Sequence, residues 1–376
     1  MEPEAAYPAA RIVSPKVYAY FTRQRAELGG NGRMATLPDT ATIQAIVDAA
    51  FWASLRREEG FIPKISLAFV SPQETKQALL FERPLPLDPG ILTKIAPAVE
   101  RPGIHLGVSH GPDGLAVWGA TRAIPSLCFV VEVAAPGLIV IKHHSSEAAG
   151  KFVNVAVLEG DQVKIVDERA SAIPDCPALL TALLGSESQA AWATSANQSV
   201  NVLVQVAVSM RAHGRGGSLL VVPALSDVWR ESIVSPIPYA VSPPFTTLAD
   251  LAQHSSDESG KLGRAVDAVA GLTAVDGAVV LTDQYHVLGF GAKITRRQGN
   301  PLVEQIIMTE PIEGGEATLA HPDKLGGTRH LSAAQFVQDQ QDCAALVASQ
   351  DGRFTVFEWS PCENMVHAHR IEALLL

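Results

Sequence analysis

The longest apolar stretch of the chain is LCFVVEVAAPGLIVIK, residues 127–142, and it limits what the chain can fold into. Glu132, Pro136 and Gly137 interrupt it, so it is too broken for a helix that crosses a membrane. Its two halves are rich in β-branched residues and flank a Pro-Gly turn signal. The stretch therefore predicts two strands joined by a tight turn, and no membrane partner is expected.

Composition and charge favour a folded protein of the cytoplasm. The 376 residues are 47% hydrophobic and 18% charged, which is typical of globular chains, and the length is enough for two domains. The net charge is −10, from 29 basic and 39 acidic residues without a Lys/Arg run, so no nucleic-acid duplex is expected as a partner. The N-terminus is acidic and lacks a secretory apolar core. The cysteines form no C-x-x-C pair, which favours a reducing compartment. They are Cys128, Cys176, Cys343 and Cys362.

The first half predicts a smaller α+β domain. Residues 1–38 are rich in Gly, Pro and Ala and are expected to form an irregular N-terminal segment. Asp39 or Thr40 can cap a helix that ends at Gly60, because apolar residues recur at helical spacing after it. Runs of β-branched residues with turn signals then predict mostly antiparallel strands. A short helix, PALLTALLG, closes this domain, which we expect to occupy residues 39–190.

The second half, residues 195–360, alternates helices with buried strands. This pattern predicts an α/β fold with a central mixed sheet flanked by helices. AVDGAVVLT and HVLGFGAKI, for example, indicate two strands joined by a short turn. The Pro-rich segment IVSPIPYAVSPPF and residues 296–325 are expected to be loops, and residues 361–376 a C-terminal tail.

Asp276, Gly277 and Ala278 stand at the start of the buried strand AVVL. Ligands of α/β sheets bind at sheet edges, and glycine lets a ligand approach the backbone closely. Asp276 could hold a divalent cation and through it activate a ribose hydroxyl. The alternative is an ordinary type I turn or strand cap, since Asp-Gly is a common turn pair.

A second motif, Gly326-Gly327-Thr328-Arg329-His330, precedes the helical segment LSAAQFV. Thr328 can cap this helix while free backbone N–H groups point outward. A helix N-terminus with two basic side chains can bind phosphate oxygens. The alternative is a capped surface helix whose Arg329 and His330 are simply solvated.

In combination, the two motifs resemble the diadenylate cyclase domain of bacteria. The similarity covers about residues 195–360, roughly half of the chain, and also includes the segments LLVVPA, VLGFGA and CAALVASQDGRFTVF. The resemblance implies a fold that binds ATP with Mg²⁺ or Mn²⁺ and condenses two ATP molecules into cyclic di-AMP. The first half resembles the DACNV-type probable sensor domain that accompanies some cyclase-like proteins.

The resemblance also assigns roles to single residues. Asp276 matches the metal-binding, catalytic aspartate, and Arg329 and His330 match catalytic residues of the phosphate-contacting loop. The strand that holds adenine and the serine after the next strand are matched as well. The residues expected to contact the nucleotide are Gly277, Ala278, Leu288, Gly289, Gly327, Thr328 and Ser349.

The chain departs from the family pattern at three positions. Leu331 stands where the family has a second arginine, and Gln350 where a glutamate helps with the metal. Val275 replaces a histidine found in some branches. Because nucleotidyl transfer depends on charge stabilisation, losing one guanidinium contact could cost a few kcal/mol, on the order of a hundredfold in rate. The family joins nucleotides from two facing subunits, so a catalytic protein is expected to be a homo-oligomer. Two functions remain open: a divergent cyclase, and a sensor of ATP or an adenine dinucleotide without turnover.

Other candidate motifs favour ordinary structure. His143 and His144 are adjacent on an expected strand and therefore face opposite sides, which disfavours shared metal binding. His367 and His369 share a face, but no Cys or carboxylate partner is evident, so a solvated terminal strand is expected. GRGG at 214–217 lacks the Lys-Ser/Thr ending of a P-loop and predicts a turn before a strand.

Overall fold

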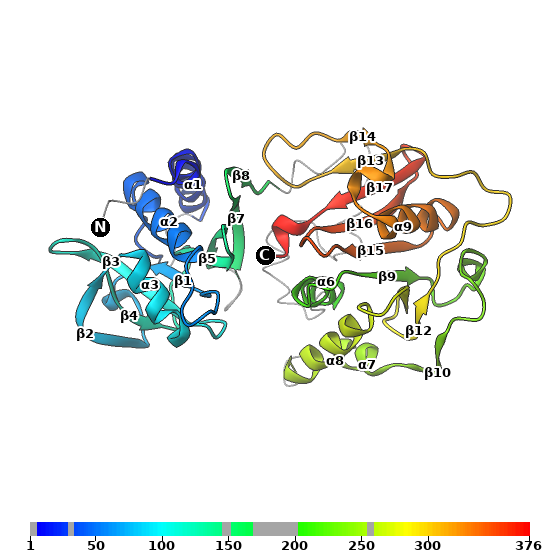
Figure 1. Ribbon diagram of the computed structural model, residues 1–376, viewed down its shortest axis with the longest axis horizontal. Helices are drawn as coiled ribbons and strands as arrows, with labels where there is room; N and C mark the ends of the chain where they lie inside the picture. Colours follow the sequence, from blue (N-terminus) through cyan, green and yellow to red (C-terminus); the bar gives the residue numbers. More distant parts are fainter. Residues whose placement is uncertain (1–5, 29–33, 145–151, 168–201, 254–258) are drawn as a thin grey trace. The chain divides into compact units, whose positions relative to one another are not determined.

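The computed structural model describes residues 6–28, 34–144, 152–167, 202–253 and 259–376 (Figure 1). The chain divides into two compact units, one ending at Val166 and the other running from Asp167 to Leu375. Each unit has a mixed sheet flanked by helices. The helix expected at 177–185 and the domain boundary expected at residue 190 lie outside the described residues. Among the described helices, none is both long and apolar enough to cross a membrane.

The first unit carries three α-helices and two 3-10 turns. They are α1 (Pro8–Glu27), α2 (Thr40–Ser54), η1 (Pro72–Glu74), α3 (Pro89–Ile95) and η2 (Ala96–Ala98). Asp39 caps α2, since its carboxylate accepts a hydrogen bond from the Thr42 amide at 2.7 Å. The helix ends at Ser54 rather than at Gly60, because the buried apolar positions stop at Ala53.

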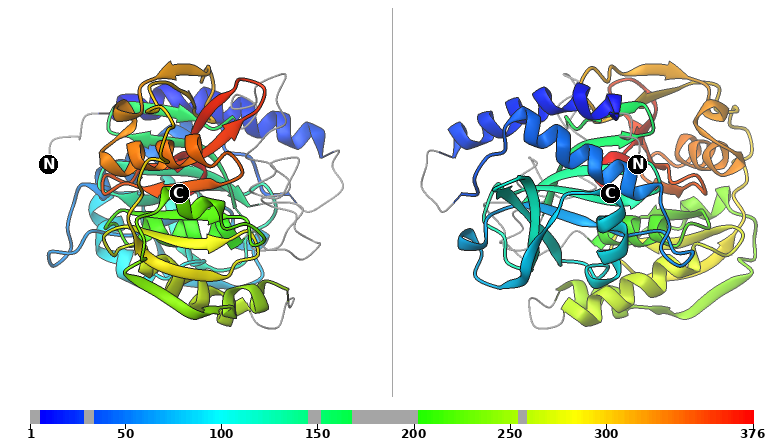
Figure 2. Two further views of the ribbon diagram at one scale, coloured as in Figure 1. Left: turned by 90° about the vertical axis from the view of Figure 1, so that its right-hand side faces the viewer. Right: turned by 60° about the vertical axis from the view of Figure 1, so that its left-hand side comes forward.

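The expectation of an irregular segment at residues 1–38 was wrong, because α1 lies within it. Pro8 occupies the first turn, where its missing N–H costs no hydrogen bond. Apolar residues then recur every three or four positions, and Val13, Val17 and Phe21 are buried. Figure 2 shows α1 and α2 side by side, which completes the helical layer of this unit.

The first sheet has eight strands in the order β2-β4-β3-β1-β5-β6-β7-β8. All of its pairs are antiparallel except β1 with β3, as the sequence led us to expect. The helices pack on one face, where side chains such as Leu67 and Val131 join their core. The strands are β1 (Ser66–Phe69), β2 (Ala78–Pro86), β3 (His105–Gly111), β4 (Gly114–Thr121), β5 (Phe129–Ala135), β6 (Leu138–His144), β7 (Phe152–Glu159) and β8 (Gln162–Ile165).

The second sheet has nine strands in the order β10-β12-β11-β9-β15-β16-β17-β13-β14. Two pairs, β9 with β11 and β13 with β17, are parallel, so the sheet is mixed. The strands are β9 (Gly217–Val222), β10 (Tyr239–Phe245), β11 (Ala278–Thr282), β12 (Val287–Ala292), β13 (Ile306–Thr309), β14 (Thr318–Ala320), β15 (Ala344–Ala348), β16 (Phe354–Ser360) and β17 (Met365–Arg370).

Helices cover both faces of the second sheet. Residues of α6 (Val202–Ala212), α7 (Thr247–Gln253) and α8 (Ser259–Leu272) share one core with strand residues such as Leu219 and Val279. Helix α9 (Thr328–Asp339) packs on the other face against the alternate positions, such as Leu220 and Val280. The alternation of β9 and β11 residues between the two cores explains their continuous apolar sequences. The described residues of this unit also form the short turns η4 (Val228–Ser232), η5 (Pro322–Leu325) and η6 (Glu372–Leu374).

Strands occur in two segments that were expected to be loops and in the expected C-terminal tail. The Pro-rich segment forms β10, which is an edge strand and can therefore tolerate residues without an N–H. Residues 296–325 include β13 and β14. The expected tail, 361–376, supplies β17, which lies between β16 and β13 because Val366 and Ala368 alternate into the core under α9.

Candidate functional site

Four strand ends meet at one edge of the second sheet. Strands β11 and β9 begin there, and their registers pair Ala278 with Ser218. Strand β15 ends there, since Ala348 pairs with Gly217. Strand β12 also ends there, opposite the start of β11. The loops that carry Asp276, Ser349 and the Gly-rich turn 214–217 are therefore neighbours, although up to about 135 positions separate them in the chain.

Asp276 lies just before β11, with 89% of its side chain exposed. Lys293, the residue after β12, donates a hydrogen bond from Nζ to Asp276 Oδ2 at 2.5 Å. This hydrogen bond and the charge of Lys293 lower the pKa of the Asp276 carboxyl, and the charge of Arg329 lowers it further. The charges of two basic residues therefore act on this acid: Lys293 at the end of β12 and Arg329 of the second motif.

The glycine after Asp276 has a structural task. Gly277 has a φ of +112°, and a Cβ built on it would lie 2.4 Å from the backbone carbon of Gly291. A side chain here would therefore force β11 and β12 apart. Because neither Gly277 nor Gly291 has a side chain, the two strand ends lie close together, with Asp276 on one and Lys293 on the other. Ala278, the third residue of the motif, is buried in the core under α9.

The start of α9 borders a pocket of about 210 Å³. Gly327 is the N-cap residue and makes no side-chain cap, so the expected capping by Thr328, which is the first helical residue, is wrong. The amides of Thr328 and Arg329 lie in the first turn, where the helix offers them no carbonyl. The pocket is lined by Gly327, Thr328, Arg329, His330, Val347, Ala348, Ser349 and Gln350.

Arg329 extends from the helix start toward the Gly-rich turn. Gly216 has a φ of +70°, and a Cβ there would lie 3.1 Å from a guanidinium nitrogen of Arg329. Among the described residues, no carboxylate forms an ion pair with Arg329. Its charge is therefore available to an anion in the pocket.

His330 does not present a charged side chain to the pocket. It is only 2% exposed, and its ring packs against Phe357 and over Gly326, where a Cβ would lie 2.5 Å from Nδ1. Burial lowers the pKa of the imidazole, so it is neutral. Its Nε2 has no hydrogen-bond partner among the described residues. The first glycine of the motif thus makes room for a buried ring.

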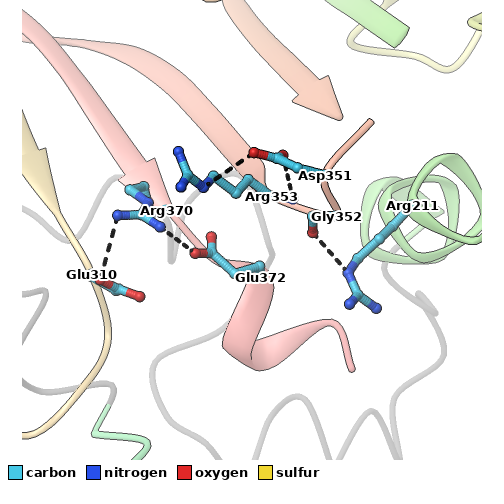
Figure 3. Close-up of polar contacts among 7 residues, drawn as sticks. All are labelled: Arg211, Glu310, Asp351, Gly352, Arg353, Arg370 and Glu372. Atoms are coloured by element: carbon cyan, nitrogen blue, oxygen red, sulfur yellow. Dashed lines mark hydrogen bonds and ion pairs between the residues drawn. The ribbon is translucent and has the colours of Figure 1, made fainter. Parts of the chain in front are cut away.

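The turn after β15 places Ser349 and Gln350 beside the helix start. The Ser349 amide donates to the Arg353 carbonyl at 2.9 Å and closes this turn. Arg211 of α6 donates from Nε to the Gly352 carbonyl at 3.1 Å (Figure 3). These contacts fix the far wall of the pocket.

Other guanidinium groups near this turn are already paired. Arg353 Nε lies 3.4 Å from an Asp351 carboxylate oxygen, and Arg370 lies 2.7 Å from Glu372 (Figure 3). A second carboxylate, that of Glu310, is 3.8 Å from Arg370. These two arginines therefore differ from Arg329, which forms no ion pair with a carboxylate in the part of the chain that the structure describes.

Leu288 and Gly289 lie on β12. A Cβ on Gly289 would lie 3.0 Å from the Tyr239 carbonyl of β10. The absence of a side chain at Gly289 therefore allows this edge strand to pack closely against β12. Leu288 packs against the core under α9. The structure brings neither residue to the pocket lining.

Two of the three departures from the family pattern, Leu331 and Gln350, have structural consequences. Leu331 is 39% exposed, so an arginine at this position would be accessible from solvent. Gln350 donates from its amide to the Arg215 carbonyl at 3.3 Å, a contact that a glutamate could not make. Arg297, a basic residue of the segment 296–325, is ion-paired with Glu231 at 2.7 Å.

The residues of this edge do not fit the divalent cation that the resemblance implies. No group of three or more His, Cys, Asp or Glu side chains within the described ranges is arranged to hold a metal ion. Mg²⁺ uses one or two carboxylates together with phosphates and water. Asp276, the carboxylate that the resemblance assigns to the metal, lies at this edge, and its Oδ2 already accepts a hydrogen bond from Lys293.

Three other histidines considered in the sequence, His143, His367 and His369, are buried. His143 is buried, and its Nε2 lies 3.2 Å from the Tyr20 hydroxyl. His367 and His369 were expected on a solvated strand, which is wrong: both are buried in β17, at 1% and 4% exposure. Thr309 bonds to His369 Nδ1 at 2.7 Å, because β13 covers this side of the strand.

Comparison with known families gives a result for the first unit. Residues 32–122 match the family described as "Probable sensor domain DACNV". The sensor-type domain expected in the first half is therefore present. The DACNV segment contains α2, α3 and strands β1 to β4, and it does not extend into the second unit. No curated protein matches the chain.

Sequence reasoning missed two participants of the sheet edge. Lys293 follows an apolar strand and carries no motif, so only the pairing of β11 with β12 reveals that it faces Asp276. Gly216 was interpreted as part of a simple turn, which is correct, but its contact with Arg329 depends on how α9 packs. The hairpin of β11 and β12 begins with Asp276-Gly277 and ends with Gly291-Ala292-Lys293. Aligning its two ends in the sequence could have indicated that Lys293 faces Asp276.

Proposed function

We propose that the second unit binds ATP at the start of α9 and is a divergent diadenylate cyclase-type nucleotidyltransferase, which the DACNV segment regulates as a sensor. The observation that carries this proposal is the meeting of the two sequence motifs. The start of β11, which follows Asp276 of the first motif, pairs with the start of β9. A Cβ on Gly216, just before β9, would lie 3.1 Å from the guanidinium of Arg329, from the second motif. A pocket of about 210 Å³ borders the same helix start.

The chemistry of the pocket suits a triphosphate. The two free amides of the first helical turn and the partial positive charge of the helix end attract phosphate oxygens. Arg329 adds a planar guanidinium that can bind two oxygens at once. His330 is neutral and buried, so its role is to position the helix start rather than to supply charge.

Condensation of two ATP molecules joins the 3′ oxygen of each ribose to the α-phosphorus of the other nucleotide and releases two pyrophosphates. Positioning and charge stabilisation dominate such transfers. Asp276, with its lowered pKa, is suited to orient the ribose hydroxyl through a hydrogen bond and is a weak base. Because each subunit holds one nucleotide, this reaction requires two copies of the chain.

A second candidate function is nucleotide sensing without turnover. It is favoured by Gln350, which is neutral and whose amide is engaged by the backbone of Arg215. Leu331 adds no charge beside Arg329. With fewer charges to stabilise a pentavalent phosphorus, binding can persist where transfer is slow.

The test is calorimetry with ATP on the purified full chain, followed by chromatography of the products. We expect ATP binding by the wild type and a loss of about tenfold or more in affinity in Arg329→Ala, the effect of deleting a charged hydrogen bond. Arg264→Ala, an exposed arginine of α8 on the other face of the sheet, is the matched control and should bind like the wild type.

The product analysis separates the two functions. Cyclic di-AMP formed by the wild type, at a rate that rises with the square of protein concentration where the chain is monomeric, supports the cyclase. ATP binding without this product supports the sensor. Absence of ATP binding in the wild type contradicts both.

A further inference from the structure

The ion pair between Asp276 and Lys293 is built into the backbone of the second unit. Strands β11 and β12 pair through Ala278 and Ala292, so the residues beyond these ends leave the sheet together. Contact between the Gly277 and Gly291 backbones closes the gap between the two loops. The Lys293 ammonium therefore meets the Asp276 carboxylate across two fixed strand ends.

This ammonium occupies the position where a divalent cation would need to bind. A metal ion at Asp276 would compete for the carboxylate with Lys293, which contacts Oδ2 at 2.5 Å. Gln350, the residue that replaces the family's second acid, donates its amide to a carbonyl and brings no negative charge. A metal ion here would therefore face one neutralised carboxylate and two cationic side chains, Lys293 and Arg329.

The same arrangement favours an anion without a metal. The carboxylate of Asp276 is balanced by one cation, and Arg329 adds a second one that has no carboxylate partner among the described residues. Lys293 is 49% exposed on its side chain, so a ligand that enters from solvent can reach it. Phosphate oxygens accept hydrogen bonds from both ammonium and guanidinium groups.

We propose that Lys293 supplies the positive charge that a divalent cation would bring to Asp276, so that this site binds the phosphates of a nucleotide without metal. The inference rests on the proposed ATP site and defines its ion requirement. It makes Lys293 a residue that determines specificity for metal-free over metal-bound nucleotide.

The experiment measures ATP affinity by calorimetry in EDTA and in excess Mg²⁺, for the wild-type full chain and for Lys293→Met. We expect wild-type affinities that agree within about twofold in the two buffers. In Lys293→Met the affinity in EDTA should fall by about tenfold or more, and Mg²⁺ should recover most of it, because Asp276 is then free. Lys324→Met, an exposed lysine of η5 with the same change in charge, should behave like the wild type in both buffers.

Direct metal binding gives a second readout. The electron paramagnetic resonance signal of free Mn²⁺ in the presence of ATP should drop further with Lys293→Met than with the wild type, and circular dichroism melting will show that both are folded. Wild-type ATP binding that needs Mg²⁺, or an unchanged affinity of Lys293→Met in EDTA, overturns the inference and leaves the proposed function standing. Absence of wild-type binding in both buffers overturns the inference and the proposed function together.

Discussion

Glu358 offers a quantitative test of how the second sheet is packed. It lies on β16 opposite His367 of β17, is 6% exposed, and its Oε1 has no hydrogen-bond partner among the described residues. Burial raises the pKa of this carboxyl from 4.5 to about 7. The folded protein therefore keeps a proton that the unfolded chain releases in this pH window, so the free energy of unfolding falls as the pH rises through it.

The size of the effect follows from the pKa difference. One pKa unit corresponds to about 1.4 kcal/mol, so Glu358 should remove about 3 kcal/mol of stability between pH 4.5 and 7. Glu358→Gln does not ionise and should lack this loss. Urea unfolding at about pH 5 and about pH 8, followed by tryptophan fluorescence, measures the difference between wild type and variant at each pH.

Glu363→Gln is the matched control, since Glu363 is exposed in the turn between β16 and β17. It should keep the wild-type dependence on pH. If Glu358→Gln loses stability with rising pH as steeply as the wild type does, the carboxyl is not buried as described and the reasoning fails.

Three further predictions concern the fold and the site. Gly277→Ala should destabilise the second unit by more than about 1 kcal/mol, because both its positive φ and the adjacent backbone oppose a side chain; an unchanged melting temperature would contradict this. Asp39→Ala should cost about 1 kcal/mol through the lost cap of α2, measured by urea unfolding, while Asp39→Asn should recover most of it. The double variant Leu331→Arg with Gln350→Glu should raise the yield of cyclic di-AMP if these positions limit turnover, and an unchanged yield would show that they do not.

The sequence predicted correctly those elements whose formation depends on residues close to them in the chain. The cap at Asp39, the helix that follows and the strands of β5 and β6 depend on neighbours within a few residues, so periodicity and turn signals predicted them. The same holds for β9 after its glycine turn and for the α9 helix.

Signals failed where distant segments decide the outcome. Prolines made β10 look like a loop, yet its position at the sheet edge tolerates them. Two histidines suggested that β17 is solvated, yet both are buried, and Thr309 of β13, 60 residues away in the chain, hydrogen-bonds to His369. Lys293 could not be recognised because its partner is set by pairing between strands. The DACNV match agrees with the sensor-type domain predicted for the first half.

The buried histidines of β17 have a consequence for how this strand finds its place. Its neighbours accept apolar side chains on the α9 face and His367 and His369 on the opposite face. A slip by one residue would exchange the two sets, moving two imidazoles into the α9 core and breaking the bond from Thr309. A misaligned β17 would therefore be less stable, and the polarity of its histidines favours a single register between β16 and β13.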